Sequence, residues 1–160
     1  SVTSIGDCAF KSCHSLTSIY IPEGVTSIGN DMFGGCSSLT SINIPNSVNS
    51  IGSSMFGGCS SLTSINIPNS VNSIEHNAFE ECSSLTSIDI PESVTSIGEN
   101  AFDGCLLTHI SSLNTTAPTL GSNVFANLPT NGTLHIKPGA TGYDAWLNAL
   151  PSGWVIVEVL

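Results

Sequence analysis

The chain has 160 residues, enough for one domain with a sizeable core. Forty per cent of its residues are hydrophobic, which argues against disorder, and only 9% are charged, against about 25% in ordinary soluble domains. Two basic residues, both lysines, stand against twelve acidic ones, so the net charge is -10. Such a chain repels phosphate groups and offers little to displace their counterions, which excludes nucleic acid as a partner.

The start of the chain carries no recognisable targeting segment. Ser1 is not a methionine, and it begins inside a repeating pattern, so we expect a mature protein or a piece of a longer one. No apolar run approaches the roughly 18 residues that a membrane-spanning helix needs. We therefore expect no direct membrane insertion.

The sequence repeats itself. Copies of one pattern begin at Ser1, Gly24, Ser47, Ser70 and Ser93, spaced 23 residues apart. The fifth copy loses one residue after Cys105, and a weaker sixth copy follows over 119–138. A fixed period of this length is typical of a solenoid, in which each copy forms one coil stacked on the next. We predict a repeat solenoid over 1–138, with regular coils to about 110 and a divergent sixth over 111–138.

Each coil contains two extended segments. One has the pattern Leu-x-x-Ile-x-Ile-Pro, as in Leu39 to Pro45, and reads as a strand that the proline ends. The other is shorter, as in Val48 to Ile51. The segment that ends at Cys59 is too short for a real helix and favours a 3₁₀ or helical turn. Coils stacked about 4.8 Å apart would then give parallel β-strands on two sides of a weakly curved solenoid.

The two ends of the solenoid differ. The pattern stops at Gly139, and we expect residues 139–160 to form a C-terminal cap with a helix over 143–150 and a strand over 154–160. The first coil keeps the apolar residues of the inner coils, such as Leu16 and Ile19, which we expect to point inward together with Ile28 of the second coil. Its open N-terminal edge predicts an upstream coil or contact with another chain.

Five cysteines stand 23 residues apart: Cys13, Cys36, Cys59, Cys82 and Cys105, with the last of the six, Cys8, outside this column. We expect the column to be reduced and buried, each thiol acting as a small hydrophobic side chain. The alternatives are disulfides between neighbouring coils and a metal site, but a Cys-x-x-Cys spacing or a histidine partner is missing. Cys8 is the candidate reactive thiol.

No catalytic or cofactor-binding motif stands out from the repeat, so we expect no enzyme, no cofactor and no metal site. Gly6, Gly29, Gly52 and Gly98 recur with the coil, and we expect them to be turn residues that tolerate a positive φ. Acidic residues such as Glu80 and Asp103 gather in the C-terminal half. We interpret them as a solvated acidic face, with a cation site as the alternative.

Three columns of the longer strand face outward. The first is Thr17, Thr40, Thr63 and Thr86, the second is Ser18, Ser41, Ser64, Ser87 and His109, and the third is Tyr20, Asn43, Asn66 and Asp89. Together they form the outer face, our candidate binding surface. Rows of hydroxyls and amides suit glycans or extended polypeptides. The third column varies along the stack, so we expect specificity there; the alternative is that these residues only keep an exposed sheet soluble.

The coil resembles the BspA-like class of leucine-rich repeats, the TpLRR type, whose unit has the form LxxIxIPxxVxxIGxxAFxxCxx. The matching residues of one coil are Leu39, Ile42, Ile44, Pro45, Val48, Ile51, Gly52, Phe56 and Cys59. The closing segment from Lys137 is also similar to those of the family. The resemblance implies a secreted or cell-surface protein of a host-associated bacterium or a parasitic protist, and some members adhere to host matrix proteins or to other cells.

Two functions compete on this basis. The first is a non-catalytic, adhesin-like binding module located outside the cell or on its surface, with a host protein or glycan as its partner. The second is a structural spacer within a larger surface protein. An ice-binding protein is disfavoured because threonine alternates with serine and isoleucine rather than forming Thr-x-Thr ranks.

Overall fold

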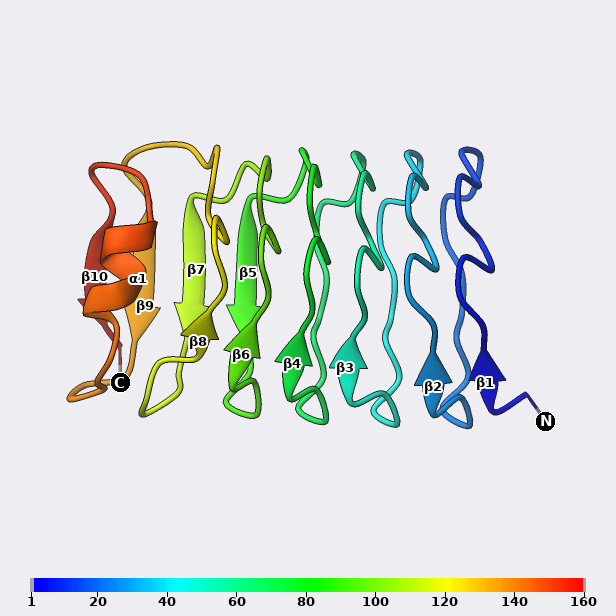
Figure 1. Ribbon diagram of the computed structural model, residues 1–160, viewed down its shortest axis with the longest axis horizontal. Helices are drawn as coiled ribbons and strands as arrows, with labels where there is room; N and C mark the ends of the chain where they lie inside the picture. Colours follow the sequence, from blue (N-terminus) through cyan, green and yellow to red (C-terminus); the bar gives the residue numbers. More distant parts are fainter. Residues whose placement is uncertain (1, 160) are drawn as a thin grey trace.

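The coils stack in a nearly straight row, as the computed structural model of residues 2–159 shows (Figure 1). Each coil runs along one side of the molecule and returns along the other, so the strands on the two sides point in opposite directions. The predicted solenoid with parallel strands on two sides is therefore confirmed.

Two-residue strands line one side, which we call the short-strand side. Strand β1 (Ser4–Ile5) pairs with β2 (Ser27–Ile28). A separate sheet contains β3 (Ser50–Ile51), β4 (Ser73–Ile74), β6 (Ser96–Ile97) and β8 (Thr119–Leu120), in that order. Every pair is parallel, and each isoleucine is aligned with the equivalent residue of the next coil.

The main sheet on the other side is complete only in the C-terminal half. It contains β5 (Ser87–Ile90), β7 (His109–Ser112), β9 (Thr133–Ile136) and β10 (Val155–Glu158), all parallel. In the earlier coils the expected strands are reduced to single bridges at Tyr20, Asn43 and Asn66. Proline lacks an N–H, so strand pairing ends early where prolines lie side by side in neighbouring coils. Strand β7 is followed by Leu113 instead of a proline.

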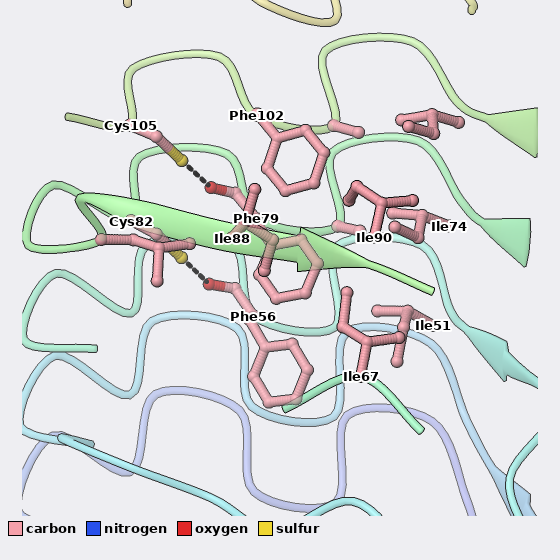
Figure 2. Packing of buried hydrophobic residues seen from close by; sticks show 14 of the residues in the cluster. Ile51, Phe56, Ile67, Ile74, Phe79, Cys82, Ile88, Ile90, Phe102 and Cys105 are labelled. Carbon is pink, nitrogen blue, oxygen red and sulfur yellow. Dashed lines mark hydrogen bonds between the residues drawn. The ribbon is translucent and has the colours of Figure 1, made fainter. Parts of the chain in front are cut away.

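The core is a set of ladders that run along the solenoid axis. Phenylalanine rings from successive coils stack nearly parallel, from Phe10 to Phe125, with centroids 5.3–6.2 Å apart. Figure 2 shows part of this stack, Phe56, Phe79 and Phe102, with Ile74 and Ile90 to one side of the rings. Each apolar side chain thus packs against the equivalent side chain of the next coil, so a single coil could not bury its own apolar residues.

The segment between the two sides folds as consecutive turns. In one coil the Gly57 N–H donates to Ser54 and the Cys59 N–H donates to Phe56, both to carbonyl groups three residues earlier. The Phe56 N–H donates to the next coil, at the carbonyl of Ala78, 2.9 Å away. These turns therefore form a third line of contact between coils and satisfy the backbone there.

Two positions of every turn adopt a left-handed backbone. The first column is Cys8, Asp31, Ser54, Asn77, Asn100 and Asn123, and the second is Ser12, Gly35, Gly58, Glu81, Gly104 and Asn127. Asparagine, aspartate and glycine tolerate this conformation best, which accounts for most of both columns. Glu81, with a φ of 57°, departs most from this preference.

The expectation that the Gly6, Gly29, Gly52 and Gly98 column has a positive φ is wrong. The reason for glycine there is space. A Cβ on Gly29 would lie 2.3 Å from the backbone nitrogen of Asp7, and one on Gly98 would lie 2.5 Å from that of His76. Gly6 lies in the first described coil, and no atom of residues 2–159 lies within 4 Å of such a Cβ. The restriction does not hold in every coil, because a Cβ on Gly52 would first meet the Asn30 side chain, at 3.0 Å, and the fourth coil has Glu75 at this position.

Burial is weaker at the N-terminal end. Leu16, Ile19 and Ile28 point toward the core, but they are only partly buried, whereas Leu39 and Ile51 of later coils are fully buried. Leu16 and Ile19 belong to the first described coil, which packs against one neighbouring coil, and Ile28 of the second coil pairs with Ile5, which is itself only partly buried. Val2 is 64% exposed, which fits the same pattern.

The last residues pack onto the end of the stack. Helix α1 (Asp144–Ala149) and strand β10 lie where a helix and a strand were expected (Figure 1). Trp146 continues the phenylalanine stack, with its ring 5.3 Å from that of Phe125, and its Nε1 donates to the Pro118 carbonyl. The Tyr143 hydroxyl bonds to Ser112, and the Trp154 Nε1 donates to Pro129. Within residues 2–159, no helix has the length and apolar character to cross a membrane.

Candidate binding surface

The outer face is exposed throughout. Every candidate residue lies open to solvent: Ser18, Ser41, Ser64, Ser87, Thr40, Thr63, Tyr20, Asn43, Asn66 and Asp89. Alternation accounts for the second and third columns, because the isoleucine between them, such as Ile42 or Ile88, points into the core. The threonine that comes directly before each serine is exposed as well. The structure thus agrees with the predicted orientation of all three columns.

The threonine column is used within the scaffold. The Thr40 hydroxyl donates to the carbonyl of Thr17 at 3.3 Å, and the Thr63 hydroxyl donates to that of Thr40 at 3.4 Å. The backbone N–H groups of Thr40 and Thr63 donate to the same carbonyls. These hydroxyls stabilise the stacking of coils, so their protons are not free for a ligand.

The third column keeps its hydrogen-bonding capacity. Bridges pair Tyr20 with Asn43 and Asn43 with Asn66, so these side chains form one row along the stack. In the part of the chain that the structure describes, the side chains of Asn43, Asn66 and Asp89 make no hydrogen bond to the protein. Their amide and carboxylate groups therefore remain available to a partner.

A shallow open hollow of about 330 Å³ lies at the C-terminal end of this row. Asn66 and Asp89 line it together with Asn69, Glu92 and Ser111. Asn69 and Glu92 follow the prolines that end the strands, and sequence reasoning missed them because it considered only the strand columns. Ser111 could have been found by allowing for the missing residue of the fifth coil, since it pairs with Asp89.

The cysteine column is buried, except at its start. Cys36, Cys59, Cys82 and Cys105 are buried free thiols, and each donates to the carbonyl of a phenylalanine in the preceding coil. Figure 2 shows two of these contacts, from Cys82 and Cys105. Cys13 is exposed, contrary to expectation, because no coil covers it. Cys8 is exposed as well.

Burial makes the inner thiols unreactive. It raises the pKa of Cys59 to about 12, and it also raises the pKa of Cys36. The neighbouring Cys105 thiol and burial together raise the pKa of Cys82. Because the thiolate is the reactive form, these side chains serve packing rather than chemistry.

The acidic side chains of the C-terminal half are spread out. Glu80 accepts a hydrogen bond from Asn77, Asp103 accepts one from Asn127, and Glu92 pairs with Lys137. Among the described residues, no three His, Cys, Asp or Glu side chains are grouped as metal ligands would be. These acids therefore do not form a metal centre in this structure.

The repeat, the ladders and the stacked strands define a leucine-rich-repeat solenoid. The chain belongs to the BspA type leucine rich repeat family, whose repeat region matches residues 3–131 in six copies. This family is a repeat scaffold that is generally non-enzymatic and that suits a binding or structural module. A comparison with curated proteins gives no match.

Solved structures agree with this assignment. A leucine-rich repeat protein from Bacteroides ovatus is 38% identical, with a TM-score of 0.72 over 84% of this chain and 37% of its own. A leucine rich cell surface protein from Faecalibacterium prausnitzii is 40% identical, with a TM-score of 0.68 over 69% of this chain and 30% of its own. The T. pallidum leucine rich repeat protein is 23% identical, with a TM-score of 0.65 over 99% and 81% of the two chains, and it supports the fold alone. The chain spans about a third of the length of the first two proteins.

Proposed function

We propose that this chain is a non-catalytic binding module of a secreted or cell-surface protein, and that it contacts host proteins or glycans as an adhesin does. The observation that carries the proposal is the third column of the outer face. It is exposed, it varies along the stack, and its polar groups are not used by the scaffold. The cell-surface protein of Faecalibacterium prausnitzii, at 40% identity, supports the location.

The division of work between columns supports the same proposal. Phenylalanine, cysteine and threonine residues hold neighbouring coils together and are repeated with little change. Tyr20, Asn43, Asn66 and Asp89 pair through their backbones, but within residues 2–159 their side chains make no such contribution. In a repeat scaffold, the exposed residues that do not stabilise the fold determine which partner is bound.

A structural spacer is the second candidate. The observation that favours it is the straight, regular stack, together with the much greater length of the relatives from Bacteroides ovatus and Faecalibacterium prausnitzii (Figure 1). A spacer would hold another domain away from the cell and would need no ligand of its own.

A binding screen separates the two candidates. The purified chain is passed over immobilised fibronectin, laminin, collagen and neutral polysaccharides in a surface plasmon resonance instrument. We expect weak, saturable binding to at least one of them, because the outer face has a single large anchor, Tyr20. A change of Glu80 and Asp103 to lysine should leave that binding intact. Failure to bind any surface would favour the spacer, and loss of binding in the Glu80/Asp103 variant would move the site to the acidic turns.

A further inference from the structure

We propose that the ligand of the outer face is a neutral glycan chain, which lies along the third column from Tyr20 to Asp89. This inference rests on the proposed function, because it assigns a ligand class to the same surface. Charge, the nature of the exposed side chains and the shape of the surface carry it.

Charge excludes anionic ligands. The chain has two lysines and no arginine, and both lysines are already in ion pairs, Lys11 with Asp31 and Lys137 with Glu92. Neither lies in a column of the outer face. The face itself carries Asp89, and the net charge of the chain is -10. A sulfated or acidic polysaccharide would therefore be repelled, whereas an uncharged chain would not.

The exposed side chains match a sugar better than a protein surface. Tyr20 is 73% exposed, and it is the one large apolar side chain in the three columns. The other exposed apolar side chains of this sheet, Val155 and Val157, lie on β10, which β7 and β9 separate from Asp89. Protein interfaces need several aromatic or aliphatic anchors in a desolvated centre. A single ring beside amides instead suits a sugar, whose C–H face packs on an aromatic ring while its hydroxyls bond to amides and carboxylates.

The geometry of the row fits a linear polymer. Tyr20, Asn43 and Asn66 are successive partners in parallel pairing, so their strands lie about 4.8 Å apart. This step is comparable to the length of one sugar ring. The row ends in the hollow of about 330 Å³ between Asn66 and Asp89, which is at the lower end of the range of about 300–1,000 Å³ for ligand pockets. Ile90 and Pro91 also line it, beside the polar residues.

Affinity electrophoresis tests this inference. The chain is run in gels that contain dextran, mannan, laminarin or xylan as neutral polysaccharides, and heparin as an anionic one. We expect retardation by at least one neutral polysaccharide and none by heparin. Tyr20→Ala should weaken the retardation about tenfold or more, equivalent to the loss of about 1.4 kcal/mol, while Tyr20→Phe should keep it within about threefold. Equal melting temperatures will show that the variants remain folded.

The outcomes distinguish this inference from the function on which it rests. If no neutral polysaccharide retards the chain but a matrix protein binds it through the outer face, the glycan assignment is wrong and the binding module stands. If heparin retards it more than the neutral polysaccharides, the charge argument is wrong. If Tyr20→Ala binds a polysaccharide as well as the parent, the site lies elsewhere. If neither sugars nor matrix proteins bind, both proposals fail.

Discussion

The Cys59 thiol lies 3.2 Å from the carbonyl oxygen of Phe33 in the preceding coil and donates a hydrogen bond to it. Cys36 makes the same contact with Phe10, and Cys82 with Phe56. The cysteine column therefore does more than fill space. The Phe33 carbonyl already accepts the N–H of Cys36 in its own turn, and the thiol adds a second donor from the next coil. The column thus joins neighbouring coils through both packing and hydrogen bonding.

Removal of an inner thiol should destabilise the solenoid. Cys59→Ala leaves the Phe33 carbonyl without this donor and opens a small cavity, so we expect a loss of about 1–3 kcal/mol in the free energy of unfolding. Cys13→Ala removes the exposed first member of the column and should change stability by less than about 0.5 kcal/mol. Chemical denaturation measures both. Equal losses in the two variants would contradict the role of burial.

The buried thiols also predict a dependence on pH. Burial raises the pKa of Cys59 from an ordinary value of 9.0 to about 12, so the folded chain keeps a proton that the unfolded chain loses. Stability should therefore be unaffected by this group below pH 9 and should fall as the pH rises from about 9 to about 12, by at most about 1.4 kcal/mol per pH unit. Denaturation at several pH values should show a shallower fall in Cys59→Ala. An identical slope in parent and variant would refute the assignment.

The glycine column gives a test of how closely the coils approach. Gly98→Ala places a Cβ against the backbone of His76, and we expect a loss of about 1–3 kcal/mol because the coils must move apart. Gly6→Ala occupies the equivalent position of the first coil, where nothing lies within 4 Å, and should be nearly neutral. Thermal melting of the two variants provides the comparison. A destabilised Gly6→Ala beside a neutral Gly98→Ala would show that the stacking direction is misassigned.

Left-handed residues offer a way to stabilise the chain. Glu81 has a φ of 57° where three other coils have glycine, so Glu81→Gly should raise the free energy of unfolding by about 1 kcal/mol. Glu80→Gly is the matched control, because Glu80 is not left-handed and accepts a hydrogen bond from Asn77. We expect Glu80→Gly to lower the free energy of unfolding. The opposite order in urea denaturation would argue against backbone strain at Glu81.

Much of the fold could be predicted from the repeat. The 23-residue period fixes which residues stack, so the inward Phe and Ile ladders and the outward columns follow directly from it. The alternation around Asn43 and Asn66 identified the candidate surface in the same way. The repeat period does not predict, however, how burial changes in the first described coil. Cys13 is exposed there because the described residues contain no coil that covers it.

Contacts that depend on distances between coils could not be predicted. Gly29 is expected to be a turn residue, but its role is to let its backbone approach Asp7 of the preceding coil, a contact that the sequence pattern does not contain. The strands of the first coils are shorter than expected because hydrogen bonds, unlike side-chain patterns, are lost where prolines are aligned. The hollow beside Asp89 likewise combines a strand with two turns, which are distant in the pattern.

The most direct test of the account compares two double variants with equal charge. Asn43→Lys with Asn66→Lys alters the third column, and Asn49→Lys with Asn72→Lys alters exposed residues next to the short-strand side of the same coils. Binding is measured by surface plasmon resonance to the matrix protein or polysaccharide that gives the strongest signal with the parent chain. We expect the first variant to lose affinity about tenfold or more and the second to stay within about twofold. Equal affinity in both, or a loss confined to the Asn49/Asn72 variant, would contradict the claim that this solenoid binds its partner through the outer face.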